Sequence, residues 1–154
     1  MMIIGIGGAG RAEQKMLTYK GAWFEINYPA GFTVKPGQKS TTRQEGYDSV
    51  YFISPDRSVE FFVYSPQWKG EGEGIEINPN LETLIEQNTE KHKSKKIRWF
   101  TVKAKDNSYL RSIRDDTTES TRLVFGIKYK NKAMYDKYYH DYIAFKESLR
   151  QFAD

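Results

Sequence analysis

The sequence predicts an α+β domain built on a central, mainly antiparallel sheet of six to seven strands, with a long C-terminal helix packed on it. Two patterns lead to this prediction. Apolar side chains recur at every second position over residues 123–129, as in a half-buried strand. Directly afterwards the apolar spacing changes to three and four residues, as in an amphipathic helix. Strand-rich and helical stretches also follow one another without the regular alternation of parallel α/β folds.

The composition fits a single domain without a thiol or metal scaffold. The 154 residues include three Trp, eleven Tyr and nine Phe, which bury large areas per side chain. The chain has no cysteine, which excludes disulfides, thiol catalysis and thiolate metal ligands. The 24 basic and 20 acidic residues are well mixed, which indicates solubility and not a nucleic-acid partner. No apolar run is long enough to span a membrane as a helix.

The first twenty residues contain a glycine-rich motif. Gly5, Gly7 and Gly10 match the GxGxxG pattern of dinucleotide-binding turns. That motif needs a following crossover helix, and residues 11–18 are too few to form one before the next strand. We therefore expect no bound cofactor.

The same segment has two other interpretations. Its short apolar run, followed by small residues around Arg11, is similar to the end of an export leader. The alternative is a flexible terminus without a role. The leader is favoured, so residues 1–20 are set apart from a single domain at 21–154. Export to a periplasmic or envelope location is expected, with a cytoplasmic location as the alternative.

The first strand group begins at residues 23–28 and continues at 32–34 after Pro29 and Gly31. A polar loop is predicted over residues 35–48. The next two strands, 50–53 and 59–64, flank a turn at residues 54–58, which favours a hairpin. Because both of these strands are apolar at nearly every position, we expect them at the centre of the sheet, with helices covering at least one face.

A helix is predicted after this strand group. Asn78 is a suitable N-cap and Pro79 suits the first helical position. The expected buried side consists of Leu81, Leu84, Ile85 and Asn88. The basic end of the segment suits the negative end of a helix dipole.

A second hairpin and the closing strand and helix complete the chain. Residues 97–105 and 109–113 are strands around a turn at 106–108. Asn131 is the expected N-cap of the last helix. The aromatic face of that helix is formed by Tyr135, Tyr138, Tyr142, Phe145, Leu149 and Phe152.

Aromatic residues at the end of the second central strand are the candidate binding surface. Tyr64 ends the strand and Trp68 follows it. If Trp68 is exposed, it supplies an anchor for a protein or a small ligand. If it is buried, it closes the end of the sheet.

Two further candidates have simpler structural explanations. Asp136 and His140 are four residues apart on the last helix, which suits a small hydrolase or half of a metal site, but such a pair is more often structural. The basic run Lys91–Arg98, followed by Trp99 and Phe100, suits nucleic-acid binding. A solvated helix end explains the same run, so no nucleic acid is expected.

The segment Ala22-Trp23-Phe24-Glu25-Ile26-Asn27-Tyr28-Pro29-Ala30-Gly31-Phe32 resembles the opening of PsbP-like and DcrB-like domains. The hairpin around Ser54-Pro55-Asp56 and the ending at residues 145–152 are similar as well. The resemblance implies a sheet between helices, an α/β/α sandwich. It also implies a non-enzymatic role, as in extrinsic photosystem II subunits, exported bacterial proteins or lipoproteins, and a Ran-binding relative. The chain departs from the lipoproteins because it has no lipid-accepting cysteine. We therefore expect an exported, non-enzymatic binding or assembly module.

Overall fold

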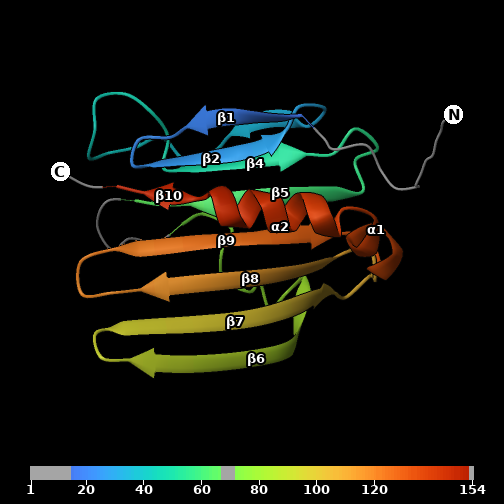
Figure 1. Ribbon diagram of the computed structural model, residues 1–154. Helices are drawn as coiled ribbons and strands as arrows, with labels where there is room; N and C mark the ends of the chain where they lie inside the picture. The colour runs from blue at the N-terminus through green and yellow to red at the C-terminus, as the bar shows by residue number, and fades with distance from the viewer. Residues whose placement is uncertain (1–14, 67–71, 153–154) are drawn as a thin grey trace, which may run out of the picture.

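The structure, a computed structural model, describes residues 15–66 and 72–152. Figure 1 shows a broad sheet with the helices on one of its faces. The elements are β1 (Met16–Lys20), β2 (Phe24–Pro29), β3 (Thr33–Pro36), β4 (Ser49–Ile53), β5 (Val59–Tyr64), β6 (Glu82–His92), β7 (Lys95–Ala104), β8 (Leu110–Thr117), β9 (Arg122–Tyr129), α1 (Lys132–Lys137), α2 (Tyr139–Ser148) and β10 (Arg150–Gln151).

The strands of the described residues form two antiparallel sheets. The large sheet has seven strands in the order β3-β4-β5-β9-β8-β7-β6, and the small sheet has three in the order β1-β2-β10. Each neighbouring pair runs antiparallel. The predicted α+β class, the antiparallel sheet and the C-terminal helix are therefore confirmed.

The main core lies between the large sheet and a layer formed by the small sheet and α2. Phe145 of α2 packs on two central strands, with its ring centroid 5.5 Å from that of Phe52 and 4.9 Å from that of Phe61. The residues buried in this cluster are Phe24, Ile26, Phe32, Val50, Phe52, Val59, Phe61, Val63, Ile127, Tyr138, Tyr142 and Phe145. We call this side of the large sheet the helix face.

The predicted C-terminal helix is divided into two. The Asn131 side chain caps α1 by accepting a hydrogen bond from the Met134 N–H at 3.0 Å, as expected. The helix is interrupted at Tyr138, whose ring packs edge-on against Phe32. It ends at Ser148, because β10 pairs with β2. The end of the predicted aromatic face is therefore wrong, and Phe152 is 37% exposed.

Both predicted hairpins are present. In the first, the Asp56 carboxylate accepts hydrogen bonds from Ser54 Oγ at 2.8 Å, Ser58 Oγ at 2.7 Å and the Ser58 N–H at 3.0 Å. The left-handed position of this turn is Arg57, with φ of 61°. These bonds close the turn between β4 and β5, since aspartate side chains mimic a backbone turn.

The helix predicted from Asn78 is wrong, because residues 82–92 form the edge strand β6. The helix start signal does form one turn, in which the Asn78 carbonyl accepts the Glu82 N–H and the Glu82 carboxylate accepts the Asn78 N–H. Pairing with β7 then replaces the helix, so Leu84 and Ile85 are exposed. Long-range pairing has overridden a weak local preference.

The opposite face of the large sheet has a second core without a helix. Its buried residues are Phe62, Tyr64, Ile75, Phe100, Val102, Ile113 and Val124. Segment 72–78 covers this face with Ile75 and the half-buried Ile77. Since β6 replaces the expected helix, the described residues do not form the second helical layer of the predicted α/β/α sandwich.

A buried ion pair fixes segment 72–78 to the sheet. Arg111 Nε and Nη2 each donate to a carboxylate oxygen of Glu82 at 2.8 Å. The same guanidinium donates to the carbonyl oxygens of Gly74 at 2.9 Å and Glu76 at 3.2 Å. One arginine therefore joins β8, the start of β6 and the covering segment.

The predicted domain start also needs correction. β1 (Met16–Lys20) pairs along its whole length with β2, so the fold includes residues 16–20. This strand was not predicted because only Met16 and Tyr19 are partly buried, so its sequence has no clear alternation of apolar residues. The leader and the GxGxxG motif lie outside the described residues, and the leader stays a prediction.

Candidate functional site

The candidate site is a groove on the helix face, between α2 and the edge strand β6. Figure 1 shows that α2 lies in front of β5 and β9 and leaves β8, β7 and β6 uncovered on that side. The groove has a volume of about 860 Å³. Its lining residues are Glu86, Asn88, Glu90, Trp99, Phe100, Thr101, Ser112, Ile113, Arg114, Phe125, Tyr135, Tyr142, Lys146 and Glu147.

The floor of the groove comes from alternate residues of neighbouring strands. Asn88, Trp99, Arg114 and Phe125 are aligned across β6, β7, β8 and β9 by the strand register. Since side chains alternate between the two faces of a strand, these four point to the same face. The floor is therefore polar at the edge strand and more aromatic toward the helix.

The central guanidinium of the floor is held by a carboxylate and two rings. Arg114 Nε and Nη2 donate to the two carboxylate oxygens of Asp116 at 2.8 and 3.2 Å. The guanidinium carbon lies 5.4 Å from the Trp99 ring centroid and 5.8 Å from that of Phe125. Cation–π contacts and a two-point carboxylate bond fix the position of such a group.

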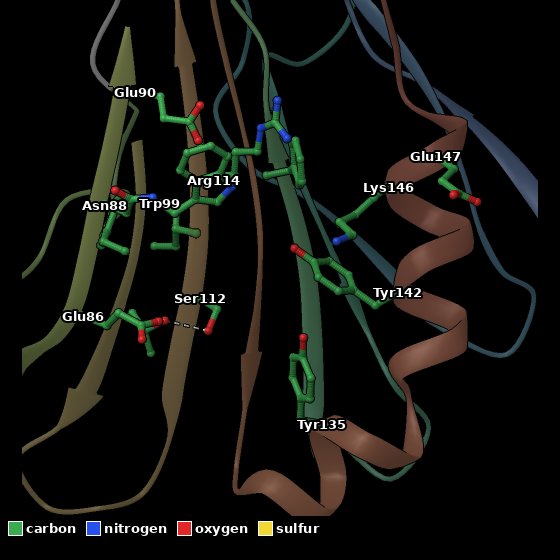
Figure 2. A pocket seen from close by; sticks show the side chains of 14 residues that line it. Glu86, Asn88, Glu90, Trp99, Ser112, Arg114, Tyr135, Tyr142, Lys146 and Glu147 are labelled. Atoms are coloured by element: carbon green, nitrogen blue, oxygen red, sulfur yellow. Dashed lines mark hydrogen bonds between the residues drawn. The ribbon is translucent and has the colours of Figure 1, made fainter. Parts of the chain in front are cut away.

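The helix wall presents phenol groups. Figure 2 shows Tyr135 and Tyr142 extending from the helical segment toward the sheet. Burial, together with the neighbouring Tyr135, raises the pKa of Tyr142. Burial also raises the pKa of Tyr135. Both phenols are therefore neutral at pH 7 and are able to donate or accept a hydrogen bond.

Lys146 also extends from α2 into the groove (Figure 2). Burial and then the positive charge of Arg114 lower the pKa of Lys146, whereas Glu147 acts in the opposite direction. Its ammonium lies 5.0 Å from the Tyr142 ring centroid. Within the described part of the chain, the Lys146 ammonium contacts the Tyr142 ring and makes no hydrogen bond or ion pair.

The edge wall is acidic and exposed. Glu86, Asn88 and Glu90 project from β6 on the same face. Glu90 binds the His92 ring nitrogen at 2.8 Å. The groove therefore has a carboxylate-rich side opposite the side that carries Lys146.

The hydroxyl groups on the floor bond to one another. Ser112 Oγ lies 3.0 Å from Thr101 Oγ1 and 3.2 Å from the Tyr129 hydroxyl. Neither His92 nor His140 lines the groove. The arrangement therefore suits binding by ring contacts and hydrogen bonds better than nucleophilic attack, which needs a base beside the hydroxyl.

Tyr64, one of the two residues of the predicted binding surface, is buried in the structure. Tyr64 is 2% exposed and lies in the second core, with the Arg122 guanidinium 5.8 Å from its ring centroid. It therefore does not offer its ring to a partner. Trp68 lies outside the described residues, and its role stays a prediction.

The structure does not bring Asp136 and His140 together. Because the helix is interrupted at Tyr138, Asp136 ends up in α1 and His140 in α2. Asp136 instead pairs with Lys132 at 2.9 Å. His140 is exposed beside the ring of Tyr139. Among the described residues, no three His, Asp or Glu side chains form a group able to hold a metal ion.

The basic run Lys91–Arg98 is the β6–β7 hairpin and not a helix end. Lys95 pairs with Asp116 at 3.4 Å. Arg98 turns to the opposite face, where it pairs with Glu76 at 3.0 Å and lies over the buried Phe100 ring. Lys95 and Arg98 therefore lie on opposite faces of the hairpin, and each pairs with a carboxylate.

Sequence reasoning missed most of the groove. The alternation in residues 97–105 and 109–113 placed Trp99 in a strand and left open which face it occupies. The helix predicted from Asn78 concealed the alternation of Glu86, Asn88 and Glu90. Reading residues 82–92 with period two would have placed these three side chains on one face.

Comparison with known proteins finds a similarity in structure and none in sequence. No model of a known protein family matches the sequence. A search of curated proteins also finds no match. The fold is similar to the solution structure of cyanobacterial PsbP (CyanoP) from Synechocystis sp. PCC 6803, with a TM-score of 0.55 and 10% sequence identity. The match covers 93% of this chain and 96% of that chain. It confirms the resemblance at the level of the fold.

Proposed function

We propose that this domain, which has a PsbP-like fold, is a binding module without catalytic activity, and that its groove holds a small organic ligand. The observation that carries the proposal is the part of the helix face between α2 and β6 that the described residues leave uncovered. A sheet face of this width is normally covered by another layer. Here it is lined instead by aromatic rings and by hydrogen-bonding groups from four strands and the helical segment.

The size and chemistry of the groove support a small ligand. Its volume of about 860 Å³ is within the range of small-molecule pockets. Trp99 and Phe125 offer apolar contact, and the phenols of Tyr135 and Tyr142 offer directed hydrogen bonds. Such a combination of apolar lining and a few polar groups fixes the orientation of a ligand.

The absence of catalysis is part of the proposal. It is supported by the Ser112 hydroxyl, which bonds to Thr101 and Tyr129 and has no basic partner. It is also supported by the positions of His92 and His140, which are exposed and are not among the lining residues, although His92 bonds to Glu90 at the edge.

Export is proposed from the first residues and from the resemblance to PsbP-like domains. The apolar and small residues at 1–12 support a leader. None of the described helices has the length and apolar character to cross a membrane. Identifying the N-terminus of the protein recovered from its host, by mass spectrometry, tests this part. A start near Ala12 or Glu13 supports export, and an intact Met1 contradicts it.

Ligand-observed NMR with a library of small organic molecules tests the groove. The blocking variant is N88W, which places a large ring on the exposed edge of the groove. The matched control is T89W, because Thr89 is the next residue of β6 and faces the opposite side. We expect binders of the unmodified protein to be lost in N88W and kept in T89W. Equal binding by both variants contradicts the assignment.

A further inference from the structure

Lys146 of α2 and Arg114 of β8 are the two positively charged side chains among the residues that line the groove. We propose that these two side chains bind a single anionic group of the ligand, a carboxylate or a phosphate. The inference rests on the proposed function, because it names the chemistry of the ligand that the groove holds. Figure 2 shows the two side chains entering the groove from the helix and from the sheet.

The Lys146 ammonium lies in a partly buried position within the groove. The side chain is half-buried, and its pKa is lowered by burial and by the charge of Arg114. Among the described residues its ammonium makes no hydrogen bond or ion pair, and the charge of the neighbouring Glu147 only partly offsets the lowering of its pKa. Burying a charge is unfavourable unless it is paired, so an anion at this point would stabilise the ammonium.

The Arg114 guanidinium is held in place before any ligand binds. Asp116 holds Nε and Nη2, while Trp99 and Phe125 lie beside the guanidinium. No hydrogen bond from Nη1 occurs among the described residues, which leaves this donor for a ligand oxygen. Charge-assisted bonds from an arginine fixed in this way lose little side-chain entropy on binding.

The other side chains of the groove limit what the rest of the ligand can be. The half-buried rings of Trp99 and Phe125 lie beside the Arg114 guanidinium and suit a planar or apolar body. Glu86, Glu90 and Glu147 also line the groove, and they repel further negative charge. The groove therefore favours a ligand with one anionic group and an apolar body, and it disfavours polyanions.

Titrations with three probes test the inference. The probes are 3-phenylpropionate, phenyl phosphate and the neutral 3-phenylpropionamide, followed by amide chemical shifts at pH 7. We expect both anions to bind at least about tenfold more tightly than the neutral amide, since one hydrogen bond to a charged group contributes about that factor or more. Phenyl phosphate and 3-phenylpropionate then distinguish a phosphate site from a carboxylate site by their relative affinity.

Three variants assign the effect to Lys146. K146Q should remove most of the preference for the anions, and K146R should keep it. K130Q, which removes an exposed lysine away from the groove, is the charge-matched control and should behave as the unmodified protein. The pKa of the Lys146 ammonium gives a direct readout and is measured from the pH dependence of its side-chain resonance. This pKa should rise when the anion binds.

The outcomes separate the two proposals. If the neutral probe binds in the groove as tightly as the anions, or K146Q binds them unchanged, the anion site is wrong while the groove remains a binding site. If the groove amides respond to none of these probes and the library molecules also fail to bind, the proposed function itself is wrong.

Discussion

Phe62 of β5 packs directly over Gly126 of β9, the residue opposite it in the sheet. A Cβ atom on Gly126 would lie 2.6 Å from Phe62 Cζ and 2.6 Å from the Ser112 carbonyl oxygen. The glycine therefore makes room for an aromatic ring in the middle of the sheet. The contact lies in the second core, directly behind the strands that form the floor of the groove.

Replacing this glycine should destabilise the protein. G126A inserts a methyl group into a space already filled by a ring and a backbone carbonyl, and such overpacking costs about 1–3 kcal/mol. The control is G31A, since a Cβ there meets only Pro55 at an ordinary 3.5 Å. Urea unfolding checks both variants. Equal stability of G126A and G31A would contradict the packing described for Phe62.

The buried pair of Arg111 and Glu82 should be far more important for stability than the exposed pair of Arg98 and Glu76. R111A leaves the Glu82 carboxylate buried without its partner, which costs about 3–5 kcal/mol. R98A removes a pair near the surface, which contributes about 0–1 kcal/mol, and a cation–π contact with Phe100, which contributes about 0.5–1 kcal/mol. Urea unfolding of the two variants at pH 7 should separate them clearly. A loss in R98A as large as in R111A would contradict the assigned roles.

Acid should weaken the fold through Glu82. Although burial alone raises the pKa of Glu82, hydrogen bonds from Arg111, the Asn78 N–H and Tyr109 hold that pKa below its ordinary value. A lowered folded-state pKa stabilises the protein above the ordinary value of about 4.3, and this stabilisation is lost as pH falls through the folded-state pKa. The stability difference between the unmodified protein and E82Q should therefore shrink below about pH 4. A constant difference from pH 7 to pH 3 would argue against this linkage.

The Lys146 pKa should depend on Arg114. We expect R114Q to raise the pKa of Lys146 toward its ordinary value, because one of the two causes of the lowering is removed. Burial remains, so part of the lowering should persist. Side-chain NMR of the lysine ammonium groups gives this pKa directly. An unchanged Lys146 pKa in R114Q would show that the two side chains are not close enough to act together on an anion.

The central part of the fold could be predicted because its local signals agree with its long-range contacts. Asp56 closes a turn between two strands that are apolar on both faces, and Asn131 caps the following helical segment. Period-two and helical patterns are clear where a side chain sits against the core. The same reasoning placed Tyr142 and Phe145 correctly on the buried side of the last helix.

The edge of the sheet could not be predicted in the same way. Residues 78–82 carry a true helix start signal, but it closes only one turn before β6 begins. β6 is exposed along nearly its whole length, so burial leaves no alternating apolar pattern in its sequence. The pairing of β6 with β7 decides the structure there, and such pairing is not visible in a single segment.

The candidate site depended on that edge. The residues of the groove come from β6, β7, β8, β9 and the helical segment, and their meeting is set by strand register. Trp99 was visible in the sequence as a ring after a basic run, but its partner Arg114 lies in a different strand. Without the sheet order, no sequence spacing joins Lys146 to Arg114.

The most direct test of the account is to map, by backbone amide chemical shifts, where the small molecules found by ligand-observed NMR bind. If the groove is the binding site, we expect the shifts to be concentrated at residues 86–90, 99–101, 112–114 and 135–147, on the helix face of the sheet. Shifts confined to segment 72–78 and the second core on the opposite face, or no response from the groove residues, would contradict it.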